Sequence, residues 1–135
     1  MSARRLAKEI KIGNVTIGGE HPVAVQSMTN TDTRNINATV RQIKRLERLG
    51  CEIVRVAIPD IKAAEAVALI KEKINIPLVA DIHFDARLAE ISALRGADKL
   101  RINPGNIGKK KDILRVVKAA LNNSIPLRIG VNSGS

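Results

Sequence analysis

Short apolar runs alternate along the chain with longer stretches in which apolar residues recur about every three or four positions. The short runs begin near residues 23, 53, 78, 99 and 127, and they are rich in Val and Ile, which is typical of strands. The intervening stretches predict amphipathic helices at about 37–49, 61–73 and 110–122, and a further helix begins after Asp85. Strands that alternate with helices form a parallel sheet with right-handed crossovers, so the pattern predicts an α/β fold.

Capping and stop residues define the bounds of these expected helices. Asp60 and Asp85 lie where an N-cap is expected, and Gly50 and Gly96 lie where a helix is expected to end. Each helix then has one apolar face that we expect to point to the core. Its members are Val40, Ile43, Leu46 and Leu49 in the first helix, Ala64, Val67 and Ile70 in the second, and Leu88, Ile91 and Leu94 in the third.

The segment before the first of these units has a different pattern. Residues 10–19 alternate around Gly13-Asn14, a two-residue turn signal, and predict a β-hairpin ahead of the main fold. The run 23–28 then predicts the first parallel strand. Five strands cannot close an eight-stranded barrel and would leave an unpaired edge. We therefore expect residues 1–135 to form the N-terminal part of a TIM-type barrel, within a larger protein.

Arginine occurs among apolar residues in three of the expected strands, as Arg55, Arg101 and Arg128. Burying an arginine without a partner of opposite charge costs on the order of several kcal/mol. An anion bound by all three arginines would explain their positions. A diphosphate suits the planar guanidinium, which binds phosphate oxygens two at a time. Asn103 and Asn132 would add uncharged donors. The alternative is that each arginine pairs with a nearby carboxylate inside the barrel.

Two further residues at a strand end suggest proton chemistry. Asp81 and His83 are two apart on one strand and so share a face, which suits general acid–base work or the orientation of a hydroxyl group. A structural hydrogen-bonded pair is the alternative.

Residues 109–111 are three lysines at the start of a helix, where they unfavourably face the positive end of its dipole. They are either a solvated basic cluster or extra positive potential for the anion site.

Composition narrows the choice of partner. The net charge of +10 favours phosphorylated metabolites, polyanions or an acidic protein. Nucleic acid is disfavoured because Phe84 is the single aromatic residue, which leaves no platform for base stacking. The chain has a single cysteine, Cys51, which excludes an internal disulfide. We expect it to be a small buried apolar residue. No apolar run reaches the roughly 18 residues of a membrane span, so a cytoplasmic protein is expected.

Five ordered motifs resemble the 4-hydroxy-3-methylbut-2-enyl diphosphate synthase family, the iron–sulfur reductases of the methylerythritol phosphate route to isoprenoids. The resemblance extends over nearly the whole chain from about residue 11. The motifs are VQSMTNTDT at 25–33, VRVA at 54–57, DIHF at 81–84, RINPGNIG at 101–108 and RIGVNSGS at 128–135.

The resemblance implies an eight-stranded barrel that binds 2-C-methyl-D-erythritol 2,4-cyclodiphosphate, followed by a C-terminal domain with a [4Fe-4S] cluster. It also implies a homodimer, and ferredoxin or flavodoxin as electron donor. Two electrons would open the ring, with loss of a hydroxyl, to give the linear allylic diphosphate. Carried onto this sequence, the resemblance assigns diphosphate binding to Arg55, Arg101 and Arg128, hydrogen bonds to His83, Asn103 and Asn132, and orientation or protonation of hydroxyls to Asp81.

The cluster ligands and the later strands of the barrel have no counterpart in these 135 residues. Cys51 matches none of the family's cluster cysteines, so we expect this chain to bind no cluster and to be inactive alone. Two other functions stay open. One is a basic phosphate-binding α/β module without redox activity, and the other is a pterin-binding type of barrel enzyme, which a chain with a single phenylalanine suits poorly.

Overall fold

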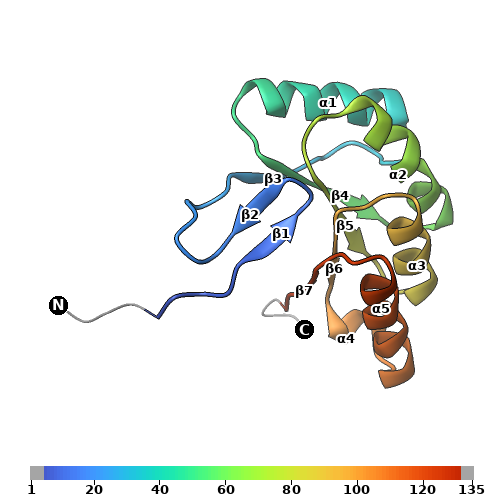
Figure 1. Ribbon diagram of the computed structural model, residues 1–135. Coiled ribbons are helices and arrows are strands. Elements are labelled where there is room, and N and C mark those ends of the chain that lie inside the picture. The colour runs from blue at the N-terminus through green and yellow to red at the C-terminus, as the bar shows by residue number, and fades with distance from the viewer. Residues whose placement is uncertain (1–4, 132–135) are drawn as a thin grey trace.

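A five-stranded parallel sheet, covered on one face by helices, forms the body of the protein in the computed structural model, which describes residues 5–131 (Figure 1). The strands are β3 (Gln26–Met28), β4 (Ile53–Ile58), β5 (Leu78–Ile82), β6 (Lys99–Ile102) and β7 (Leu127–Ile129), and they lie in that order in the sheet. The helices are α1 (Ile36–Arg48), α2 (Ile61–Lys73), α3 (Ala86–Leu94), α4 (Pro104–Ile107) and α5 (Lys110–Asn122). The predicted α/β fold is confirmed.

The main hydrophobic core lies between the sheet and the helices. Alternate residues of the central strands face it, and Val54, Leu78 and Leu100 are fully buried there. Alanines such as Ala63 and Ala89 are also fully buried, and their small side chains let the helices approach the sheet closely. The other residues of the same strands therefore face the opposite side of the sheet.

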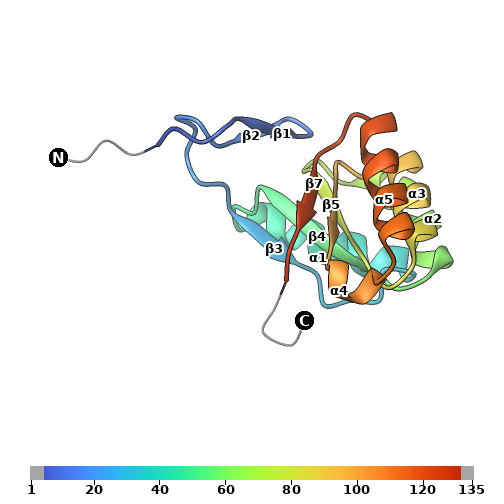
Figure 2. The same cartoon turned by 90° about the horizontal axis from the view of Figure 1, so that it is seen from below.

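An antiparallel hairpin, β1 (Ile10–Ile12) and β2 (Val15–Ile17), packs against that opposite side. Ile12 forms a small second core with Ile53 and Val79, whose side chains alternate with those of the helix-covered core. Figure 2 shows the hairpin on the side of the sheet away from α3 and α5. The predicted hairpin is confirmed, and it covers the face at the end where the strands begin.

The loop after the hairpin depends on a glycine, and this gives a first prediction. Gly18 has a φ of +82°, and a Cβ added there would lie 2.1 Å from the backbone oxygen of Lys8. Gly50 has a φ of +96° with nothing within 4 Å of such a Cβ. We expect Gly50→Ala to cost about 1 kcal/mol through its backbone conformation alone, and Gly18→Ala to cost about 2 kcal/mol because of the added clash.

Urea unfolding of the two variants and the unchanged chain measures this difference. Hydrogen exchange of the β1 and β2 amides shows whether the hairpin detaches locally in Gly18→Ala. Equal losses of unfolding free energy in the two variants would mean that the contact between the added Cβ at residue 18 and the Lys8 backbone is relieved without cost.

Most of the expected bounds agree with the structure. Asp60 caps α2 by accepting from the Ala63 N–H at 2.9 Å, and Asp85 caps α3 by accepting from the Arg87 N–H at 2.9 Å. The strand expected at 23–28 is shorter, since only Gln26–Met28 forms β3. β3 is an edge strand that pairs only with β4, and the expected residues 23–25 lie before the point where that pairing begins.

Two expected core positions were wrong. Leu49 and Leu94 are 78% and 72% exposed. Each is the last member of a row of three-residue steps, and because such a step is shorter than the 3.6-residue helical turn, the row drifts around the helix until its last residue no longer faces the core. At the end of α3 the buried residues are instead Ser92 and Ala93. The short helix α4 was also not predicted. None of the helices in the part of the chain that the structure describes is long and apolar enough to cross a membrane.

Candidate functional site

The strand register brings the predicted charged residues together on the face opposite the helices. Asp81 of β5 lies beside Arg101 of β6, and Arg101 lies beside Arg128 of β7. Arg55 of β4 is on the same face, because it alternates with the helix-facing Val54 and Val56. One side of the sheet therefore carries arginines from three strands and a carboxylate from a fourth.

Asp81 is the centre of this group. Its Oδ1 accepts a hydrogen bond from Nη1 of Arg101 at 3.2 Å, and its Oδ2 lies 3.5 Å from Nε of Arg55. The Asp81 side chain is only 5% exposed, while those of Arg55 and Arg101 are 24% and 18% exposed. One buried carboxylate thus pairs with two arginines, so the alternative of pairing with a nearby carboxylate holds for Arg55 and Arg101, though they share the same one.

The two arginines keep unused hydrogen-bond donors. The Nε atoms of Arg55 and Arg101 are buried and have no hydrogen-bond partner. Nη2 of Arg101 lies 3.5 Å from the backbone oxygen of Gly130, and a Cβ at Gly130 would come within 3.2 Å of this guanidinium. Glycine at 130 therefore leaves room for Arg101, a role that the sequence analysis missed because it treated this residue only as part of a motif.

Arg128 differs from the other two arginines. It lies on the edge strand β7, is exposed, and makes no ion pair within residues 5–131.

Asn103 is 2% exposed, and its Oδ1 caps α4 by accepting from the Gly105 N–H at 3.1 Å. That oxygen already accepts a backbone hydrogen bond that stabilises the start of α4. Asn132, the remaining predicted binding residue, lies outside the described residues.

His83 follows β5 directly, and its Nε2 lies 3.9 Å from Oδ2 of Asp81, too far for a direct hydrogen bond. Its side chain is 35% exposed. Phe84 beside it has a φ of +61°, which is uncommon for a bulky residue, and its ring lies edge-on to that of His83 with centroids 6.2 Å apart. The backbone turn at Phe84 thus sets an accessible imidazole next to the buried carboxylate.

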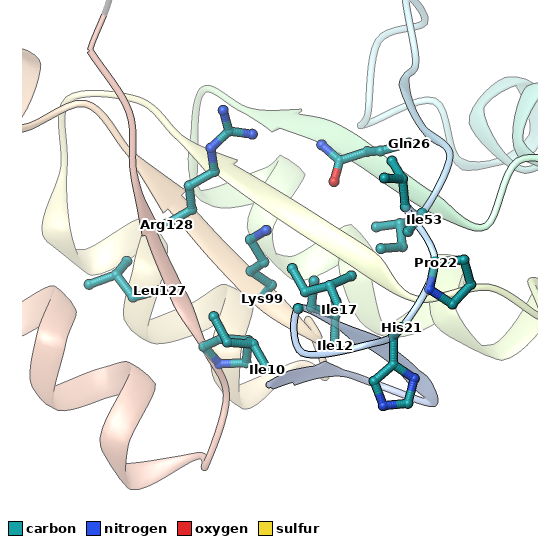
Figure 3. Close-up of a pocket in the computed structure, with 14 residues that line it drawn as sticks. Ile10, Ile12, Ile17, His21, Pro22, Gln26, Ile53, Lys99, Leu127 and Arg128 are labelled. Carbon is teal, nitrogen blue, oxygen red and sulfur yellow. The ribbon is translucent and has the colours of Figure 1, made fainter. Parts of the chain in front are cut away.

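Lys99 belongs to the same face but was not among the predicted site residues. It lies two positions before Arg101 on β6, and this spacing was the signal that could have identified it. It is 8% exposed and lines a cavity of about 590 Å³ between the hairpin and the sheet, together with Arg128 and Gln26. Figure 3 shows its side chain extending into this cavity. Burial, together with the nearby Arg128 and Arg55, lowers the pKa of the Lys99 ammonium.

Two acidic residues outside the sheet, Asp32 and Asp60, are paired with one arginine. Arg34 donates to Asp32 at 2.7 Å and to Asp60 at 3.0 Å. Hydrogen bonds from the Arg34 side chain and backbone lower the pKa of Asp32 to about 2. Asp32 is therefore ionised near neutral pH, and because Arg34 pairs with both carboxylates, they repel an incoming anion less than unpaired carboxylates would.

The residues of this chain do not fit an iron–sulfur cluster. Such a cluster is held by several cysteine thiolates, and the sequence contains one cysteine. Cys51 is buried, as expected, and its thiol lies 3.1 Å from the backbone oxygen of Ile53. Among residues 5–131, no group of three or more His, Cys, Asp or Glu side chains could hold a metal ion.

Solved structures with a similar fold are far removed in sequence. The dihydropteroate synthase of Yersinia pestis superposes with a TM-score of 0.66 at 15% identity, covering 88% of this chain and 44% of that one. The L-talarate/galactarate dehydratase of Salmonella typhimurium gives a TM-score of 0.58 at 18% identity, covering 80% of this chain and 27% of that one. These likenesses support the fold alone, so they give no support to a pterin-binding function.

Relatives in sequence are much closer. The 4-hydroxy-3-methylbut-2-en-1-yl diphosphate synthase (flavodoxin) of Caldanaerobacter subterraneus is 64% identical over 132 residues, which is 98% of this chain and 37% of that protein. The enzyme of the same name from Dehalococcoides mccartyi is 59% identical over all 135 residues, which is 39% of its length. The chain therefore spans well under half of these curated relatives. The family described as the GcpE TIM-barrel domain matches residues 7–135, and the chain belongs to that family.

Proposed function

We propose that this chain forms the diphosphate-binding part of the barrel of a 4-hydroxy-3-methylbut-2-enyl diphosphate synthase. The whole enzyme would convert 2-C-methyl-D-erythritol 2,4-cyclodiphosphate to the linear allylic diphosphate. The observation that carries the proposal is the pair of arginines on Asp81, whose buried Nε groups lack acceptors. Phosphate oxygens are acceptors that match such donors in charge and geometry.

Each residue has a role in this proposal. Arg101 and Arg55 would bind phosphate oxygens through the donors that Asp81 leaves unused. The exposed Arg128 would bind the same ligand from the edge strand. Asp81, which lies between two arginines, would accept hydrogen bonds from the hydroxyl groups of the substrate. His83 is accessible beside it and would donate a hydrogen bond to a phosphate or exchange a proton with the substrate. Asn103 and Asn132 would contribute amide hydrogen bonds.

The rest of the enzyme would supply what these residues lack. When bound, the [4Fe-4S] cluster would provide the two electrons of the reduction, and its ligands would come from the C-terminal domain of the longer protein. Flavodoxin is the proposed electron donor, because the closely similar relatives carry it in their names. A homodimer and a cytoplasmic location are further parts of the same proposal.

Calorimetric titration of the 135-residue chain with the cyclodiphosphate tests the proposal. We expect saturable binding that survives moderate salt and is stronger than that of inorganic diphosphate. Arg101→Ala should weaken it by about tenfold to a hundredfold, since it removes charge-assisted hydrogen bonds. Arg95→Ala is the matched control, because Arg95 pairs with Glu65 on the helix side of the protein.

Loss of binding to the same degree in both variants would contradict the assignment of the site. A steep fall of affinity with salt and no preference among polyanions would point instead to a general basic binding module. Absence of binding by the unchanged chain would mean that these residues do not form the site.

A further inference from the structure

Lys99 is the buried cation of this protein that the proposed function leaves without a role. Its side chain is 8% exposed, and its ammonium forms no hydrogen bond or ion pair with any residue in the range 5–131. Other cations of the structure do have such partners, for example the part-buried Lys71 with Asp98 at 2.6 Å and Arg95 with Glu65 at 2.8 Å. An ammonium that is buried and unpaired is costly, so its retention calls for a ligand that supplies the missing negative charge.

The surroundings of Lys99 are cationic on one side and apolar on the other. Arg55 lies at the same level of the sheet, since Val79 is the register partner of both Arg55 and Lys99, and Arg128 lies beside Arg101, one step closer to the strand ends. Both arginines disfavour the charged form of Lys99. Toward the hairpin the cavity is lined by apolar residues such as Ile12 and Ile17. The titratable His21 lines the far side of the cavity, where its imidazole lies 3.4 Å from Glu9.

The charges on this face do not balance without a ligand. The described strand residues of the face carry the cations Arg55, Lys99, Arg101 and Arg128, and Asp81 is the carboxylate among them. In the register, Lys99 lies beside Val79, so it is one step nearer the hairpin than the pair of Asp81 and Arg101. Its side chain extends into the cavity that Arg128 also lines (Figure 3).

We propose that Lys99 is a further cationic ligand of the diphosphate, one that favours the linear diphosphate over the cyclic one. This inference rests on the proposed function. Opening the ring breaks a carbon–oxygen bond and leaves that electron pair on the phosphate oxygen, so the linear ester carries one more ionisable oxygen than the ring. A buried ammonium placed among the phosphate ligands stabilises charge that appears during the reaction, which accelerates the step that creates it.

The test compares two ligands on the 135-residue chain by calorimetry, the cyclodiphosphate and a linear alkyl diphosphate. We expect Lys99→Met to weaken binding of the linear diphosphate by about tenfold or more, and binding of the cyclodiphosphate by less than about threefold. Lys99→Arg keeps the charge and should restore most of the preference. Lys118→Met removes an exposed lysine of α5 and should change neither affinity.

A second readout checks that Lys99→Met is folded and that the lysine is buried as described. Because the pKa of Lys99 is lower in the folded state, the unfolded state holds this proton more tightly. The free energy of unfolding should therefore rise with pH from the folded pKa up to the ordinary lysine pKa, and Lys99→Met should lose this part of the slope. Lys118→Met should retain it.

The outcomes separate the inference from the function on which it rests. If the unchanged chain binds both diphosphates and Lys99→Met weakens them equally, or weakens neither, the role given to Lys99 is wrong while the diphosphate site stands. If the unchanged chain binds neither ligand, the proposed function fails and the inference fails with it.

Discussion

Replacing Asp81 by asparagine should lower the free energy of unfolding by about 3 kcal/mol, a large part of the stability of a domain of this size. The carboxylate lies between Arg55 and Arg101 and is 5% exposed. Without it, the arginines keep their charges on a face that offers no other carboxylate within the described strands. Chemical unfolding of Asp81→Asn, followed by circular dichroism, measures the loss.

The same substitution should strengthen the binding of inorganic diphosphate severalfold, because the two guanidinium groups then lack a competing acceptor. Reduced stability combined with tighter anion binding is not a result that general unfolding produces. Glu72→Gln changes the charge equally on an exposed part of α2 and should alter neither property. If Asp81→Asn is as stable as the unchanged chain, the arginines do not depend on this carboxylate.

Truncating Leu100 to alanine should cost about 3 to 4 kcal/mol, for a different reason. Leu100 is fully buried on the helix-covered side of β6, and its removal leaves a cavity that the surrounding strands and helices close only in part. Thermal or urea unfolding measures the effect. Because Leu100 faces away from Arg101, the affinity for a diphosphate should stay unchanged at temperatures where the variant is folded.

Leu121→Ala is the control for this truncation, since Leu121 lies on α5 and is 74% exposed. It should change the unfolding free energy by no more than about 0.5 kcal/mol. A loss of diphosphate binding in folded Leu100→Ala would show that the two faces of β6 are coupled, contrary to the separation of core and site described above.

The fold could be predicted well because its signals are local. The alternation of strands and helices, the N-caps at Asp60 and Asp85, and the turn at Gly13-Asn14 each act within a few residues. Errors occurred where the expected apolar face was followed in steps of three residues. Those steps drift around a helix of 3.6 residues per turn, so Leu49 and Leu94, the last in each row, are exposed.

Which charged residues share a face could be predicted from alternation, but their pairing could not. That Asp81 serves both Arg55 and Arg101 depends on the register of three strands, which no local pattern specifies. Alternation also places Lys99 with Arg101, yet only the structure shows that this lysine is buried without a partner. The functional assignments of these residues stay predictions.

The order of the strands bears on how the protein is made. Each strand from β4 to β7 pairs with the strand directly before it in the sequence, so the sheet can grow unit by unit while the ribosome is still adding residues. Arg55 can meet Asp81 as soon as β5 joins β4, before Arg101 has been synthesised. In a nascent chain, Asp81 can thus be buried with a cation already beside it, and the proposed anion site would assemble from the N-terminal side.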